Sequence, residues 1–223
     1  MGLRRWSLLC VVALMCVMGI AVSTADAALL VSEVYYDHPG SDSDHEFLEL
    51  FNTGIEPVDL GGWLVEWVGA VWGEQALALS GVALSGRFFL IGGANTAVDF
   101  GVAPDLLVSL TLQNGGSATD GVRIRKGNYT DTVLYDAPNT AGLAGDAGWS
   151  GASFAPDVAV GRSLARWNIL LDTNEMTDFV ERVVPGPSNR FAPGPSDGTV
   201  PEPASALMTM MGMGWLLWRR HRS

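Results

Sequence analysis

The sequence predicts an all-β protein made of short strands. Runs rich in β-branched and aromatic residues recur along residues 29–165, and glycine-rich stretches such as Gly61-Gly62 and Asn114-Gly115-Gly116 separate them. Glycine favours turns there because it adopts positive φ at little steric cost. No segment of this region shows a long apolar period of 3.6 residues with capping signals, so helices should be minor. Regularly spaced short strands of this kind indicate a sandwich or a barrel.

The first two predicted strands are the clearest. Residues 29–36 are dense in β-branched and aromatic side chains, and residues 46–52 largely alternate polar with apolar side chains, which suits a half-exposed strand. A polar loop, residues 37–45, joins them. The remaining predicted strands span residues 62–68, 75–79, 87–91, 106–112, 121–125, 131–135 and 160–165. Residues 139–158, rich in Gly, Ala and Asp, are expected to form a long surface loop.

The charge balance excludes one class of partner. The 223 residues hold 13 Lys and Arg against 24 Asp and Glu, for a formal charge of −11. A nucleic-acid-binding protein needs a basic face to release counterions from phosphates, and the dense basic run here is confined to residues 219–222. We therefore expect no nucleic-acid partner.

The N-terminus has the features of a secretory signal peptide, residues 1–27. Arg4 and Arg5 precede an almost entirely apolar run over residues 7–22, and Ala25 and Ala27 give the small-x-small pattern that signal peptidase accepts before Ala28. Both cysteines of the chain lie in this segment. The mature protein should therefore have no disulfide, no thiolate metal site and no cysteine nucleophile.

The C-terminus carries a second targeting segment, residues 201–223, after a Pro/Gly-rich linker at residues 191–200. Its parts are a Pro-Glu-Pro motif, an apolar helix over residues 204–218, and a basic tail, with the defining residues Pro201, Glu202, Pro203, Arg219, Arg220 and Arg222. A helix of 15 residues is about 22 Å long, which is short for a membrane span. The arrangement resembles the PEP-CTERM sorting signal of Gram-negative bacteria.

That resemblance implies a route and a location. In the PEP-CTERM family an exosortase, an integral membrane enzyme, is thought to recognise the Pro-Glu-Pro motif and remove the helix that holds the protein in the inner membrane. The chain would then reach the cell envelope, the cell surface or the extracellular matrix, often beside an exopolysaccharide or biofilm.

The body, residues 28–190, resembles lamin-tail domains in the order of its motifs. The matching stretches are residues 30–37, 46–52, 58–64, 84–91, 120–124, 131–135 and 161–166, and Pro185-Gly-Pro-Ser-Asn189 looks like the Pro-Gly-x-x-Asn that closes those domains. The resemblance implies an immunoglobulin-like β-sandwich. It is a thin guide to function, because one fold serves many functions.

The acidic loop after the first strand is the best candidate site. Asp37, Asp42, Asp44 and Glu46 offer oxygen ligands that Ca²⁺ accepts from a flexible loop. A zinc site would instead use His38, His45 and one carboxylate. The third interpretation is an ordinary solvated loop, because Asp, Ser, Gly and Pro are turn formers. The spacing does not match an EF-hand.

Catalytic signatures are absent from the sequence, so we expect no enzyme. The nearest approach to Gly-x-Ser-x-Gly is Gly148-Trp-Ser-Gly151, and no histidine of the mature chain lies outside the acidic loop. The sequence therefore predicts a non-catalytic binding or structural module without a required cofactor. The alternatives are a Ca²⁺-dependent carbohydrate-binding module and a hydrolase that uses His45 or Glu46.

Tryptophans bear on the carbohydrate alternative because exposed indoles stack on sugar rings. Trp63 should lie in the core, delivered by the Gly61-Gly62 turn. Trp67 and Trp72 border another glycine-rich turn, where either surface exposure or packing at the core or edge fits the sequence. An extracellular polysaccharide is the partner that such indoles would suit.

Overall fold

The computed structural model describes residues 29–69, 71–115, 117–151, 153–192 and 194. The predicted signal peptide with its cleavage site at Ala25, Ala27 and Ala28, all but three residues of the linker, and the sorting signal lie outside the described residues. Among the described residues, no helix has the length and apolar character needed to cross a membrane. The apolar helix predicted over residues 204–218 lies outside the described residues, so this finding does not bear on it.

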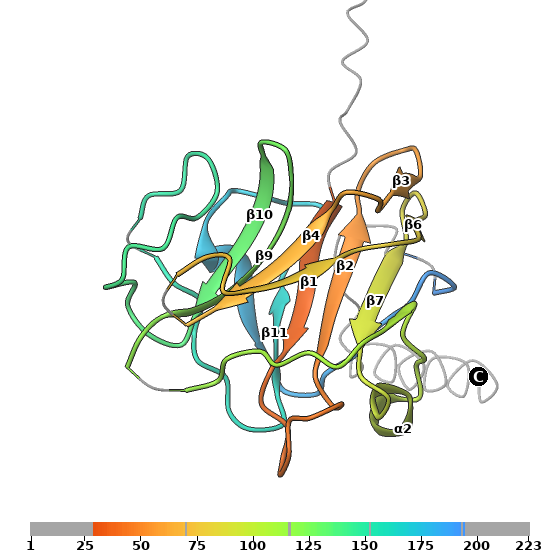
Figure 1. Cartoon of the computed structure of the whole chain (residues 1–223), viewed down its shortest axis with the longest axis horizontal. Coiled ribbons are helices and arrows are strands. Elements are labelled where there is room, and N and C mark those ends of the chain that lie inside the picture. Colours follow the sequence, from red (N-terminus) through yellow and green to blue (C-terminus); the bar gives the residue numbers. More distant parts are fainter. Residues whose placement is uncertain (1–28, 70, 116, 152, 193, 195–223) are drawn as a thin grey trace, which may run out of the picture.

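The protein is mostly β-strand, and its largest sheet has six strands in the order β12-β11-β1-β2-β7-β8 (Figure 1). All neighbours pair antiparallel except β7 and β8, which are parallel. The strands of this sheet are β1 (Leu29–Tyr35), β2 (Phe47–Asn52), β7 (Phe88–Gly92), β8 (Leu106–Leu107), β11 (Ser163–Arg166) and β12 (Phe179–Arg182).

A four-stranded antiparallel sheet, β10-β9-β4-β5, packs against the large sheet, and β3 and β6 form a small ribbon. Among the described residues, helical structure is limited to α2 (Thr96–Phe100) and one 3₁₀ turn, η1 (Met176–Asp178). The strands are β3 (Val58–Asp59), β4 (Leu64–Val68), β5 (Gln75–Ala78), β6 (Val82–Ala83), β9 (Asp120–Lys126) and β10 (Tyr129–Tyr135). The prediction of an all-β fold with minor helices is confirmed.

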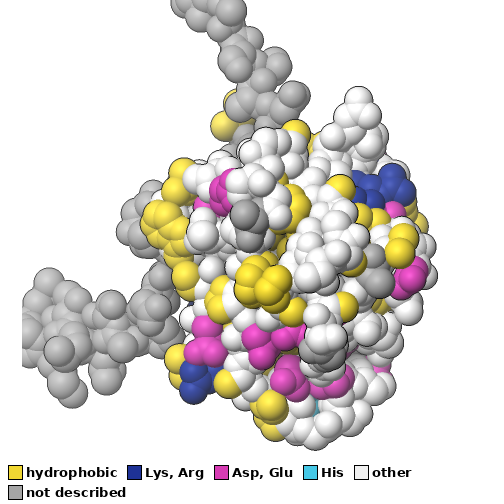
Figure 2. All heavy atoms as spheres, turned by 90° about the vertical axis from the view of Figure 1, so that its left-hand side faces the viewer, with side chains coloured by type: hydrophobic (Ala, Val, Ile, Leu, Met, Phe, Trp, Pro, Cys, Tyr) yellow, Lys and Arg dark blue, Asp and Glu magenta, His cyan; other side chains and the backbone are white. Residues whose placement is uncertain are grey.

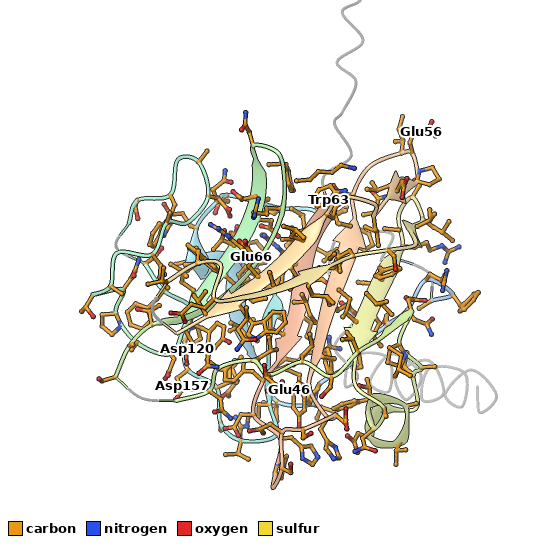
Figure 3. All side chains as sticks on the ribbon, in the orientation of Figure 1. Glu46, Glu56, Trp63, Glu66, Asp120 and Asp157 are labelled. Atoms are coloured by element: carbon orange, nitrogen blue, oxygen red, sulfur yellow. The ribbon has the colours of Figure 1, made fainter. Side chains whose placement is uncertain are left out.

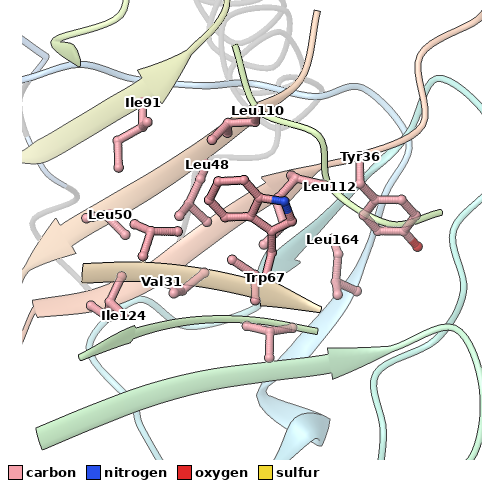
Figure 4. Close-up of a cluster of buried hydrophobic side chains, with 14 of the residues drawn as sticks. Val31, Tyr36, Leu48, Leu50, Trp67, Ile91, Leu110, Leu112, Ile124 and Leu164 are labelled. Atoms are coloured by element: carbon pink, nitrogen blue, oxygen red, sulfur yellow. The ribbon is translucent and has the colours of Figure 1, made fainter. Parts of the chain in front are cut away.

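One core lies between the two sheets. Its buried side chains come from both, including Val31 and Leu48 of the large sheet and Trp67 and Ile124 of the small one (Figure 4). Tyr36 and Tyr135 stack in the same cluster with ring centroids 4.4 Å apart. The alternation of β-strand side chains explains this core, because every second residue of each strand faces the opposite sheet.

The structure decides between the two positions open for Trp67 and corrects one predicted strand. Trp67 is only 7% exposed and belongs to the core, and the expectation that Trp63 lies in the core is confirmed at 5% exposure. The strand expected over residues 106–112 is limited to β8. Beyond it the chain leaves the sheet while Leu110 and Leu112 point into the core beside Trp67 (Figure 4). Their alternating pattern therefore reflects burial rather than strand pairing.

Residues 139–158 form no strand or helix where they are described, in agreement with the expected loop. The loop is nonetheless packed, because Leu143, Ala155 and Val158 are buried in the core. The Val158 amide donates to the Tyr36 hydroxyl at 3.0 Å, and Asp146 accepts from the Thr132 amide at 2.9 Å. The loop thus covers one end of the core.

Candidate functional site

The polar loop between β1 and β2 is held by Asp42. Its Oδ1 accepts from the His38 amide at 2.9 Å, its Oδ2 accepts from Asn114 Nδ2 at 2.9 Å, and its carbonyl accepts from the His45 amide at 3.0 Å. Aspartate commonly bonds nearby main-chain amides in this way and so organises turns. Both carboxylate oxygens of Asp42 therefore already have protein donors.

The loop lies against the turn that leads into α2. The Asn95 amide donates to the Asp44 carbonyl at 3.0 Å, and the Gly93 amide donates to the Glu46 carbonyl at 3.3 Å. Gly93 has to be glycine here, because a Cβ at this position would collide with the main chain of Asp44. This close approach positions the loop beside the helix.

That packing brings two histidines to one aspartate. His45 Nδ1 lies 2.6 Å from Asp99 Oδ2, and His38 Nε2 lies 3.9 Å from the same oxygen. The two imidazole rings stack with centroids 3.9 Å apart. Each of the three side chains is 21% exposed, so this group, which we call the His-His-Asp cluster, is open to solvent.

The outer nitrogens of both rings also have partners. His38 Nδ1 lies 3.2 Å from the Ser41 carbonyl, and His45 Nε2 lies 2.9 Å from Asn95 Nδ2. Because a carbonyl only accepts hydrogen bonds, Nδ1 of His38 carries a proton, and in the neutral tautomer the lone pair is then on Nε2. The contacts with Ser41 and Asn95 therefore fix the orientation of the two rings.

The four predicted calcium ligands do not converge on one position in the structure. Asp42 organises the loop, and Glu46 is buried with its Oε2 accepting from the Leu112 amide at 2.9 Å. Asp37 and Asp44 are half-buried. The group of metal-ligating side chains that converges among the described residues is instead His38, His45 and Asp99, whose ligand atoms lie within 4.8 Å of one another.

Asp99 is the residue that the sequence analysis missed. It lies on α2, 54 residues from His45, and neither its spacing nor its neighbours in the sequence distinguish it from any other acidic residue. The carboxylate expected for a zinc site is supplied only by tertiary packing.

Further acidic side chains lie at the same end of the molecule. Figure 2 shows Asp and Glu gathered across the lower part of one face. In Figure 3, Asp120 and Asp157 lie in the lower half of the fold, as does Glu46. Burial raises the pKa of Asp120 to about 6; the Gly115 amide opposes the shift, and Asp136 and Asp157 reinforce it. Burial, with Asp42 and Asp157, also raises the pKa of Asp37. This end therefore has a negative potential.

A different polar cluster lies on the face of the large sheet that points away from the core. Glu33 Oε1 accepts from Ser163 Oγ at 2.5 Å and from the Gly186 amide at 3.0 Å, and Glu33 Oε2 accepts from Arg182 at 2.8 Å. Glu49 accepts from Ser32 at 2.6 Å and from the Ser188 amide at 2.5 Å. Both carboxyl groups are almost fully buried. Burial raises the pKa of each, and the neighbouring Glu33 raises that of Glu49 further.

These carboxylates hold residues 183–192, which we call the closing segment. The amides that donate belong to Gly186, Ser188 and Arg190, the last one to Asp105 Oδ2 at 3.0 Å. Donors at every second residue are typical of an extended chain. Pro185 and Pro187 occupy the alternate positions, where a missing N–H loses no bond to the sheet.

Arg166 joins the two sheets at a second buried polar cluster. Its Nη2 lies 2.6 Å from Asp131 Oδ1 on β10, its Nη1 lies 3.2 Å from Asp178 Oδ2, and its Nε donates to the Val31 carbonyl at 2.9 Å. Arg166 and Asp131 side chains are each 1% exposed. The sequence pattern gave no signal of this pairing.

The indoles do not form one surface beside the loop. Trp63 and Trp67 are buried, and Trp72 and Trp149 are partly buried with their Nε1 atoms bonded to Ala144 and Ser153. Trp167 is 49% exposed, but it follows Arg166, which binds Val31 near the start of β1, whereas the loop follows the end of β1.

Comparison with known proteins adds no relative. No protein-family model matches the sequence, and neither does any curated protein. The lamin-tail and PEP-CTERM resemblances therefore rest on the motifs of this sequence alone.

Proposed function

We propose that this chain is a non-catalytic exported protein, with a lamin-tail domain of immunoglobulin-like sandwich type that an exosortase delivers to the cell surface or extracellular matrix of a Gram-negative bacterium. Signal peptidase removes residues 1–27, and the exosortase acts at Pro201, Glu202 and Pro203. The mature domain then serves as a binding or structural module beside extracellular polysaccharide.

The observation that carries this proposal is the attachment of the closing segment. Glu49 belongs to the stretch 46–52 and Ser188 to the Pro-Gly-x-x-Asn motif, so two of the stretches that support the lamin-tail resemblance bond to each other. Both sheets and the hydrogen bonds that hold the closing segment lie within residues 29–192. Cleavage near Pro203 is therefore compatible with an intact domain.

The roles of three buried acidic groups support a non-catalytic function. Glu33, Glu49 and Asp131 accept hydrogen bonds from main-chain amides or pair with arginine across the fold. Such bonds satisfy buried donors and order neighbouring segments. A catalytic carboxyl group instead needs access to a substrate.

The experiment is intact mass spectrometry of the protein from its own host, with membrane and secreted fractions measured separately. The proposal predicts a chain that begins at Ala28 and ends near Pro203, recovered mainly outside the inner membrane. Deletion of the exosortase gene should shift the protein to the membrane fraction with residues 204–223 retained. A full-length C-terminus in the normal host would contradict the proposal.

A further inference from the structure

The His-His-Asp cluster has the ligand types and spacing of a zinc site. Imidazole nitrogen and carboxylate oxygen are ordinary Zn²⁺ ligands, and bonds of about 2.0 to 2.1 Å in a tetrahedron separate ligand atoms by about 3.3 Å. Asp99 Oδ2 lies 2.6 Å from His45 Nδ1 and 3.9 Å from His38 Nε2. These distances bracket the tetrahedral value, so each changes by less than about 1 Å when a metal binds.

Groups behind the ligands prepare the two imidazoles. Metal-ligating histidines usually donate their other ring N–H to a carbonyl, a carboxylate or a water molecule. His38 does so through Nδ1 to the Ser41 carbonyl, and in the neutral tautomer the lone pair is then on Nε2, 3.9 Å from Asp99 Oδ2. His45 Nε2 faces Nδ2 of Asn95, and a flip of this side-chain amide lets its oxygen accept a hydrogen bond from the Nε2–H of a metal-bound imidazole.

The surroundings favour a cation. Besides Asp99, two carboxylates lie next to His38: Asp37 precedes it in the chain, and Asp42 Oδ1 accepts from the His38 amide at 2.9 Å. The cluster therefore lies among negative charges. Two imidazoles make the site a poor match for Ca²⁺, which takes oxygen ligands, and a good match for Zn²⁺.

We propose that His38 Nε2, His45 Nδ1 and Asp99 Oδ2 bind one Zn²⁺, with a water molecule as the fourth ligand. The metal ties the β1–β2 loop to α2, two segments that already meet where Gly93 touches Asp44. Zinc binding is independent of how the protein is exported and processed.

The test uses the protein purified from its host, freed of metal with a chelator and titrated with Zn²⁺ by calorimetry. We expect one Zn²⁺ per chain and a melting temperature that rises when Zn²⁺ is added, since a ligand of the folded state stabilises it. Co²⁺ in place of Zn²⁺ should give the visible absorption of a tetrahedral nitrogen–oxygen site.

Variants identify the ligands. His38→Ala, His45→Ala and Asp99→Asn should each lower zinc affinity by about 100-fold or more, and Asn95→Ala, outside the ligand set, by about 10-fold. Glu56→Gln changes an exposed carboxylate at the opposite end of the fold (Figure 3) and should bind like the wild type. Circular dichroism checks that each variant is folded. A wild type that binds no Zn²⁺, or equal affinity in wild type and His45→Ala, overturns the proposal.

Discussion

Two polar regions of this protein use similar side chains in opposite ways. At the closing segment, Glu33 and Glu49 are buried, and the oxygens of both accept hydrogen bonds from serine, arginine or main-chain donors. In the His-His-Asp cluster, the side chains are 21% exposed and point toward one shared position.

The difference shows how to separate groups that build a fold from groups that are available to a ligand. A buried carboxylate whose oxygens bond main-chain amides has its bonding capacity taken up by the fold. Solvent-accessible nitrogen and oxygen atoms that converge on one position remain available to a metal. The remaining polar atoms of the same side chains are held by other groups of the protein, which fixes their orientation. Burial and large pKa shifts alone would have pointed to the closing segment, where the chemistry is structural.

The largest effect should follow from breaking a buried ion pair. Arg166→Ala leaves Asp131 buried without its guanidinium partner, so we expect a loss of about 3 to 5 kcal/mol in the free energy of unfolding. Urea unfolding at pH 7 measures it, and Arg162→Ala, which removes a half-exposed pair with Glu181, is the matched control with a loss of at most about 1 kcal/mol. Equal losses in the two variants would remove the distinction between buried and exposed pairs.

The closing segment should give the next largest effect. Glu49→Leu leaves the Ser188 amide and the Ser32 hydroxyl without an acceptor, at a cost of about 1 to 3 kcal/mol. Glu49→Gln is the control, because its amide oxygen accepts from Ser188 and its amide group donates to Ser32. We expect unfolding experiments to find Glu49→Gln close to the wild type; a Gln variant as unstable as the Leu variant would mean that the charge of Glu49 matters.

Asp120 should make stability depend on pH. Its pKa of about 6 in the folded protein exceeds the unfolded value of 3.8, so the folded state binds more protons between these values. Stability from this group is therefore full below about pH 4 and is lost as the pH rises through about 6. Asp120→Asn should flatten thermal stability measured from pH 4 to 7 relative to the wild type. An unchanged slope would show that other carboxyl groups carry it.

The smallest effect should come from calcium. Both oxygens of Asp42 already bond the protein and Glu46 bonds the Leu112 amide, so millimolar Ca²⁺ should stabilise the fold by no more than about 0.4 kcal/mol. Melting curves with Ca²⁺ and with a chelator specific for Ca²⁺ measure this. A clear rise in melting temperature that Asp42→Asn abolishes would instead support the calcium site expected from the sequence.

The strands predicted correctly from the sequence are those with many side chains typical of buried β-strands. Strands β1, β2 and β7 are rich in β-branched, aromatic or leucine residues, and each is found within a residue or so of its expected bounds. The ribbon of β3 and β6 was missed because two-residue pairs carry no period, and β12 was missed because a short Phe-Val-Glu-Arg run resembles a loop. The strand expected at residues 106–112 was too long, because burial of every second side chain gives the same alternation of polar and apolar residues whether or not the chain pairs with a sheet.

The site was harder to predict than the fold. The loop that holds His38 and His45 was recognised from composition, but its carboxylate partner Asp99 depends on the contact between Gly93 and Asp44. Likewise, no pattern connects Glu33 with Gly186, which lie 153 residues apart. Such contacts arise only when the sheets and loops are packed together.

The most direct test of this account is amide hydrogen exchange in the closing segment, measured residue by residue by NMR on the exported domain. The account predicts that the amides of Gly186, Ser188 and Arg190, which donate to Glu33, Glu49 and Asp105, exchange at least about 100-fold more slowly than in an unstructured peptide. Exchange at the unstructured rate would mean that the segment does not close the fold, and the proposed function would lose the observation that carries it.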